Sequence, residues 1–331
     1  MAEIVAGIAT SHGPMLVTPP QTWGARVPDD RKATHAYRGG MWSFDELVEM
    51  RQDELLNEQI SEQVWANRHA RCQTAIDALA RRLAEARADV AIIFGNDQME
   101  AFRGGLIPAL CVFNGESLVS KPMSAQRLAQ LPQGVRSSIP GYIPETGATY
   151  AAYPELGNRI VAAAVAGGFD VATMNRLPHE ETPHAFGFVY RRLMHDAPMP
   201  SVPILLNTFY PPNQPPLRRC FDFGGMVARA VSSWESDARV ALIASGGLSH
   251  FVIDESLDQA VLDALGTGDI AALERLGEAR FQDGSSEIKN WIPLAGAMTE
   301  IGFRMAVIDY VPCYRSEAGT GNAMGFASWS R

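Results

Sequence analysis

Short runs of apolar and β-branched residues recur along the chain and predict buried β-strands. The run at 239–245 (RVALIAS) is typical, because its apolar residues are continuous rather than alternating, as in a strand covered on both faces. Strands are predicted at residues 3–9, 88–94, 106–113, 169–174, 202–208, 239–245 and 304–311.

Helical stretches lie between these runs. The longest covers 44–86 and is charged early and amphipathic later. Further helices are predicted at residues 155–167, 185–194, 221–235, 255–264 and 285–301. Alternating strands and helices predict an α/β fold, which we expect to be one three-layer domain over 1–331. A central, mostly parallel sheet would carry helices on both faces.

Two long segments rich in Gly, Pro and polar residues, 18–40 and 114–153, are predicted to be functional loops rather than simple connections. The first belongs to a region of inserted loops and helices expected at about 18–70.

Composition narrows the class of protein. The chain has 331 residues, of which 47% are hydrophobic and 20% charged, as in soluble globular proteins. Its net charge of -9 argues against nucleic acid or an anionic membrane as a partner. No apolar run reaches the roughly 18 residues of a membrane span. The start, MAEIVAGIATSHG, lacks a basic signal-peptide region, and the four cysteines form no CxxC pair, so we expect a cytoplasmic location.

Polar residues collect where four of the predicted strands end. These segments are TSHGP at 10–14, GNDQME at 95–100, PHEETPH at 178–184 and GGLSH at 246–250. Four of the seven histidines lie in them: His12, His179, His184 and His250. A single histidine in a turn is usually an ordinary polar residue. In a parallel sheet, however, the strand ends share one edge, so this clustering favours a common site.

A fifth segment, GSSEIKNWIPLAGAM at 284–298, adds a carboxylate. Serine followed by an acid is an ordinary helix start. The rest of the segment is mostly apolar, which predicts a buried helix in which Glu287 needs a partner such as a metal cation. Imidazole and carboxylate ligands are typical of non-haem iron(II) oxygenases, but zinc hydrolases use overlapping ligands.

Taken in order along the chain, these motifs resemble type III extradiol ring-cleavage dioxygenases, which are related to the catalytic subunit of protocatechuate 4,5-dioxygenase. The resemblance runs from His12 to about Met298. The segments SHGPML at 11–16 and HAYRGGMWSFDEL at 35–47 resemble the branch that includes 3-O-methylgallate dioxygenase.

The resemblance implies a set of roles. His12 and Glu287 match iron ligands, and His250 matches the histidine that exchanges protons with the substrate hydroxyl and bound oxygen. His184, or with less support His179, matches a pocket histidine that orients substrate or oxygen.

One position departs from the family pattern. Gln98 stands where the second iron-ligating histidine is expected, and its carbonyl oxygen is a weaker ligand for iron(II) than imidazole. We expect Gln98 near or on the metal, with His35 and Asp97 as alternatives in the same pocket. Ser249 is a candidate hydrogen-bond donor to the substrate. Candidate partners for a substrate carboxylate are Arg38, Arg103 and Lys289.

The implied activity is iron(II)-dependent extradiol cleavage of a catechol by O2, as in the catabolism of gallate, 3-O-methylgallate, protocatechuate or lignin-derived aromatics. Two alternatives stay open: a metal-dependent hydrolase on the same ligands, and a non-catalytic homologue whose metal site Gln98 has disabled. A homodimer with contacts through the 44–86 helix is also expected.

Overall fold

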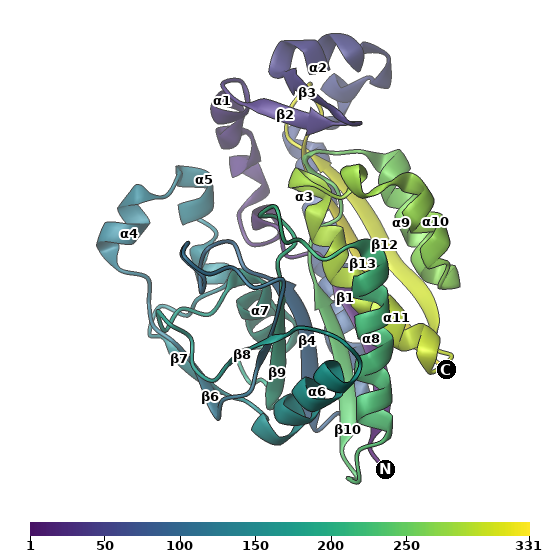
Figure 1. Cartoon of the computed structure of the whole chain (residues 1–331). Helices are drawn as coiled ribbons and strands as arrows, with labels where there is room; N and C mark the ends of the chain where they lie inside the picture. Colours follow the sequence, from purple (N-terminus) through teal and green to yellow (C-terminus); the bar gives the residue numbers. More distant parts are fainter.

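A nine-stranded mixed β-sheet forms the centre of the computed structural model, which describes the backbone of residues 1–331 and every side chain except that of Gln133 (Figure 1). The strand order is β11-β13-β1-β10-β4-β9-β5-β8, and β12 pairs with β13. The strands are β1 (Glu3–Thr10), β4 (Val90–Asn96), β5 (Leu110–Phe113), β8 (Ala172–Met174), β9 (Ser201–Leu206), β10 (Arg239–Ser245), β11 (His250–Val252), β12 (Arg304–Tyr314) and β13 (Thr320–Ser330).

The sheet is not mostly parallel, which corrects the expectation from sequence. Strands β1, β10, β4 and β9 run parallel at its centre. Strand β13 is antiparallel to β1, β11 and β12, and β5 is antiparallel to β9. A short turn joins β12 to β13, and so short a connection allows only antiparallel pairing.

Strand β8 pairs in parallel with β5, so it runs opposite to the central strands. Its carboxyl end therefore lies at the opposite edge from the ends of β1, β4 and β10. The sequence had suggested that all four ends share one edge. The following segment, 175–183, is long enough to return the chain across the sheet to His184, because an extended chain spans about 3.3–3.6 Å per residue.

Helices bury apolar residues against both faces of the sheet. Neighbouring strand residues point to opposite faces, so Ile92 and Ile93 of β4 belong to two separate apolar clusters. The cluster with Ile92 includes residues of α6, α8, α9, α10 and α11, and the cluster with Ile93 includes residues of α3 and α7. These helices are α3 (Glu62–Glu85), α6 (Pro154–Ala166), α7 (His184–Phe188), α8 (Leu217–Ser232), α9 (Glu255–Thr267), α10 (Ile270–Leu276) and α11 (Trp291–Glu300). Across the described residues, none of the helices combines the length and apolar character needed to cross a membrane.

The prediction of a single helix over 44–86 is wrong. This segment is divided into α2 (Phe44–Met50), two 3-10 turns (Gln52–Glu54 and Leu56–Gln59) and α3. Leu55 adopts a left-handed conformation with φ 52°, which ends helical geometry there. Ser61 then starts α3 by accepting a hydrogen bond from the Val64 N–H.

The two long loops contain small elements of their own. The first holds a 3-10 helix (Pro20–Arg26), α1 (Val27–Asp30) and the hairpin β2 (Thr34–Tyr37) with β3 (Gly40–Ser43). In the second, the hairpin of β6 (Ser117–Ser120) and β7 (Ala148–Ala151) encloses α4 (Ala125–Gln130), α5 (Gln133–Arg136) and a 3-10 turn (Ile139–Gly141). Figure 1 shows α4 and α5 standing apart from the central sheet. The remaining short helices are Pro14–Leu16, Val189–Leu193 (a π-helix), Glu278–Arg280 and Asp283–Asn290.

Candidate metal centre

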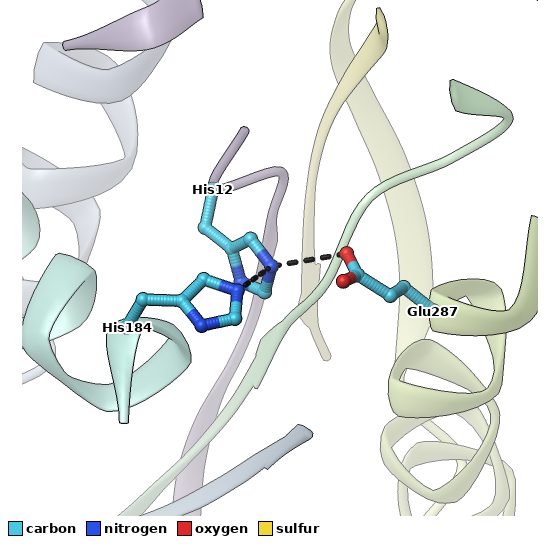
Figure 2. A group of neighbouring side chains, drawn as sticks. All are labelled: His12, His184 and Glu287. Carbon is cyan, nitrogen blue, oxygen red and sulfur yellow. Dashed lines mark hydrogen bonds and ion pairs between the residues drawn. The ribbon is translucent and has the colours of Figure 1, made fainter. Parts of the chain in front are cut away.

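Three side chains from distant parts of the chain meet beside the ends of β1, β4 and β10 (Figure 2). His12 follows β1, His184 begins α7, and Glu287 lies in the 3-10 helix Asp283–Asn290. The Nε2 atom of His12 is 3.0 Å from Oε2 of Glu287 and 3.1 Å from Nε2 of His184. One possible ligand atom from each residue lies within 4.8 Å of the others, a spacing that a single metal ion can bridge.

The hydrogen bonds of Ser245 fix the tautomer of His12. The Ser245 hydroxyl donates to the carbonyl oxygen of Ala185 at 2.6 Å, so it can only accept from His12 Nδ1, which lies 3.0 Å away. We therefore assign the imidazole hydrogen to Nδ1. The Nε2 lone pair then points into the cluster, as metal binding requires.

Glu100 fixes the tautomer of His184 in the same way. Its carboxylate accepts a hydrogen bond from the His184 backbone N–H at 3.0 Å and faces ring Nδ1 at 2.9 Å. Because an ionised carboxylate only accepts, Nδ1 carries the hydrogen. Burial lowers the pKa of His184, but the Glu100 charge outweighs it and raises that pKa to about 9. For Glu100, burial acts to raise the pKa, but the contacts with His184 outweigh burial. The pKa of Glu100 therefore lies below its ordinary value.

Glu287 is held as an anion. Its Oε1 accepts from Asn96 Nδ2 at 3.0 Å, and its Oε2 accepts from the Gly247 N–H at 2.9 Å. Burial acts to raise its pKa, but His12 and His250 favour the charged form, and the pKa lies well below the ordinary range. For His12 the balance is different, because burial is the largest influence and lowers its pKa.

The cluster thus joins a buried carboxylate to two facing ring nitrogens, each of which has a lone pair when its imidazole is neutral. Three acceptors at this distance repel unless a cation lies among them, and that cation is either a proton or a metal ion. Two imidazoles and one carboxylate form a ligand set that suits a divalent transition metal and leaves positions open for other molecules.

His250 lies close to Glu287 without joining the cluster. Its Nδ1 lies 3.1 Å from the carbonyl oxygen of Leu248, which leaves Nε2 free to accept a proton. Gly247 separates the two side chains: a Cβ there would lie 3.0 Å from His250 Nδ1 and 3.2 Å from Glu287 Oε2. Both distances are shorter than ordinary van der Waals contact, so a side chain at position 247 would push His250 or Glu287 from its place.

Gln98 also lies beside Glu287. Its amide nitrogen donates to Glu287 Oε1 at 3.3 Å, and its carbonyl oxygen accepts from the Tyr210 hydroxyl at 3.3 Å. In this orientation the amide supports the carboxylate, and His184 supplies the second imidazole of the cluster. The neighbouring Asp97 instead accepts the backbone N–H groups of Glu100, Ala101 and Phe102, so it holds the loop.

The structure does not bring three other predicted residues to the cluster. His35 lies in β2, where its Nε2 is 2.8 Å from the Asp30 carbonyl oxygen. His179 is exposed in the segment before α7. The Ser249 hydroxyl is buried and donates to Asp258 of α9 at 2.6 Å.

The basic residues considered for a substrate carboxylate face carboxylates of the chain itself. Arg103 pairs with Glu181 at 2.7 Å, buried Lys289 with Glu278 at 3.3 Å, and Arg38 with Asp254 at 3.8 Å.

Sequence reasoning missed the residues that orient the cluster: Glu100, Ser245 and Asn96. Each lies in or beside a polar segment at a strand end, and that position is the signal that could have identified them. Their partners, however, are up to 233 positions away along the chain, as for Ser245 and His12.

Comparison with known proteins gives a family match over most of the chain. The model for the catalytic LigB subunit of aromatic ring-opening dioxygenase matches residues 57–319, a range that includes His184 and Glu287 and begins after His12. Among solved structures, the crystal structure of an uncharacterized protein from Escherichia coli K12 is similar over 98% of this chain and 99% of its own, with 12% sequence identity and a TM-score of 0.47.

Proposed function

Because this chain belongs to the family of catalytic LigB subunits of aromatic ring-opening dioxygenases, we propose that it is an iron(II)-dependent extradiol dioxygenase acting on a catechol-type substrate with O2. The observation that carries the proposal is the convergence of three acceptors from His12, His184 and Glu287. Two imidazoles and one carboxylate are the ligand set of non-haem iron(II) oxygenases.

The ligand residues fit such an ion in charge as well as in kind. One carboxylate and two neutral imidazoles leave a divalent cation with a net positive charge, which favours binding of an ionised catechol oxygen. When bound, iron would supply the oxygen chemistry, while the protein supplies orientation and proton transfer. Ser245 and Glu100 prepare the two imidazoles for this task, because each holds the ring hydrogen on Nδ1.

His184 takes the role of the second ligating histidine in this proposal. Its Nε2 lies 3.1 Å from that of His12, whereas Gln98 directs its amide nitrogen to Glu287. The glutamine then need not disable the site: an imidazole from another segment compensates for it.

His250 is proposed to accept a proton from the bound catechol. The hydrogen bond to Leu248 leaves its Nε2 without a hydrogen, and Gly247 allows the ring to lie near Glu287. A positioned base of this kind contributes about 10²–10⁴-fold to a rate.

The test is anaerobic loading with iron(II), removal of unbound metal and elemental analysis, followed by oxygen uptake with gallate, 3-O-methylgallate, protocatechuate and unsubstituted catechols. We expect one iron per chain and consumption of O2 in proportion to substrate. His12→Ala should lose both properties, and His179→Ala, which changes an exposed histidine of the same protein, should keep them.

Other results would support a different function. Retention of zinc with no oxygen uptake for any catechol would favour a hydrolase on this scaffold. Failure of the unaltered protein to retain either metal would favour a non-catalytic homologue.

A further inference from the structure

A cavity of about 260 Å³ adjoins the metal cluster beside His184. Gln98, Glu100 and His184 line it on the cluster side, and a further wall comes from the segment between β6 and β7. The Tyr142 side chain, which also lines the cavity, donates a hydrogen bond from its hydroxyl to the His12 carbonyl oxygen at 2.8 Å. The cavity therefore borders the cluster through His184 and lies beside the His12 backbone.

The wall formed by the β6–β7 segment is largely apolar. Its side chains are Met123, Leu131, Val135, Ile139 and Ile143. Four of the five are only partly buried, so they leave apolar surface facing a space that lacks a protein occupant. An apolar group bound there would remove this surface from water, which is favourable.

The charged residues of the cavity are already paired. Arg127 forms an ion pair with Glu181, and Arg103 approaches the same carboxylate at 2.7 Å. Glu100 is engaged by His184. Among the described lining residues, a substrate carboxylate would find no cation that lacks an acidic partner, and it would have to displace Glu181 from Arg127.

We propose that this cavity receives a neutral, apolar substituent of the catechol, so that the enzyme prefers alkyl- or aryl-substituted catechols to carboxylated ones; this inference rests on the proposed ring-cleavage function. The volume limits the substituent to one ring or a short alkyl chain, because sites for larger drug-sized ligands occupy about 300–1,000 Å³.

The test compares catechol, 4-propylcatechol and protocatechuate with the iron-loaded protein, by anaerobic binding titration and by oxygen uptake. Each methylene that is buried should tighten binding about fourfold. We expect 4-propylcatechol to bind at least tenfold more tightly than catechol and to exceed protocatechuate in kcat/KM. A preference for protocatechuate would overturn the inference.

Two variants locate the effect in the cavity. Ile139→Trp should fill the cavity and lower the ratio of kcat/KM for 4-propylcatechol over catechol at least tenfold. Val165→Trp, on an exposed position of α6, should leave that ratio unchanged.

Glu181→Gln should release Arg127 and raise kcat/KM for protocatechuate several-fold relative to 4-propylcatechol. Its control is Glu180→Gln, which alters a neighbouring carboxylate that pairs with Lys121.

The outcomes separate the two proposals. Absence of oxygen uptake with all three compounds would contradict the proposed function, while the binding titration would still decide the preference of the cavity. Oxygen uptake with unaltered substrate ratios in Ile139→Trp and Glu181→Gln would leave the function standing and overturn the cavity assignment.

Discussion

The Nε2 atoms of His12 and His184 lie 3.1 Å apart, and the hydrogen bonds of Ser245 and Glu100 place the ring hydrogens on the far nitrogens. Without a metal, the pKa of His184, raised to about 9, keeps a proton between these two nitrogens. When both rings are neutral, two lone pairs face one another beside the Glu287 carboxylate, which is 3.0 Å from His12. Such an arrangement is costly in a buried site without a cation. The three residues are therefore expected to act as one unit in metal binding.

The first prediction concerns removal of one member of this unit. His184→Ala deletes one of three ligands and leaves His12 and Glu287 to bind the metal alone. We expect less than a tenth of the iron content of the unaltered protein after dialysis, measured by elemental analysis. His179→Ala should retain full content, and equal metal content in the two variants would show that His184 is not a ligand.

The second prediction concerns Glu100, which forms hydrogen bonds with His184. In Glu100→Gln, an amide that can flip replaces a carboxylate that accepts from both the backbone and the ring of His184. Loss of such an orienting partner typically costs about 10–100-fold in metal affinity. Competition titration with a metal-binding dye would measure the metal affinity, with Glu180→Gln as the control variant. Unchanged affinity would mean that Glu100 does not orient a ligand.

The central strands could be predicted from sequence because they are buried on both faces and read as continuous apolar runs. Strand β13 could not, although ten of its eleven residues are buried. Its sequence, TGNAMGFASWS, is rich in small and polar residues, and it becomes a strand because β12 and β1 pair with its two edges. Tertiary context decides its conformation rather than local propensity.

The candidate site was predictable as a set of strand-end segments, but not in its internal contacts. His12 and Glu287 follow from polar residues placed at the ends of apolar elements. The position of His184 depends on the course of 175–183 after β8, which runs against the direction expected for it. The orientation of Gln98 depends on contacts with Glu287 and Tyr210 from other segments.

The third prediction separates proton transfer from metal binding. His250→Ala should lower kcat by about 10²–10⁴-fold, because the proposed base is removed. Iron content should stay near that of the unaltered protein, since His250 lies outside the cluster. Oxygen uptake and elemental analysis on the same preparation measure both. Turnover at the original rate would show that another group accepts the proton.

The fourth prediction concerns Asp258, which braces the segment that carries His250. Its carboxyl group accepts from the Ser249 N–H at 2.8 Å, the Ser249 hydroxyl at 2.6 Å and the Tyr310 hydroxyl at 2.8 Å. Burial nevertheless dominates and raises the pKa of Asp258 to about 7 from 3.8. The folded protein therefore binds a proton that the unfolded chain releases at a lower pH.

It follows that the contribution of Asp258 to the free energy of unfolding is greatest at acidic pH and is lost as the pH rises from about 4 to about 7. Asp258→Asn does not titrate, so the unaltered protein should lose at most about 4 kcal/mol of stability relative to this variant over that interval. Denaturant unfolding across the interval, with a chelator present throughout, measures the difference. Asp263→Asn, an exposed change on the same helix α9, should follow the unaltered protein at every pH. If Asp258→Asn also runs parallel to the unaltered protein, the buried carboxyl group is not the one that takes up the proton on folding.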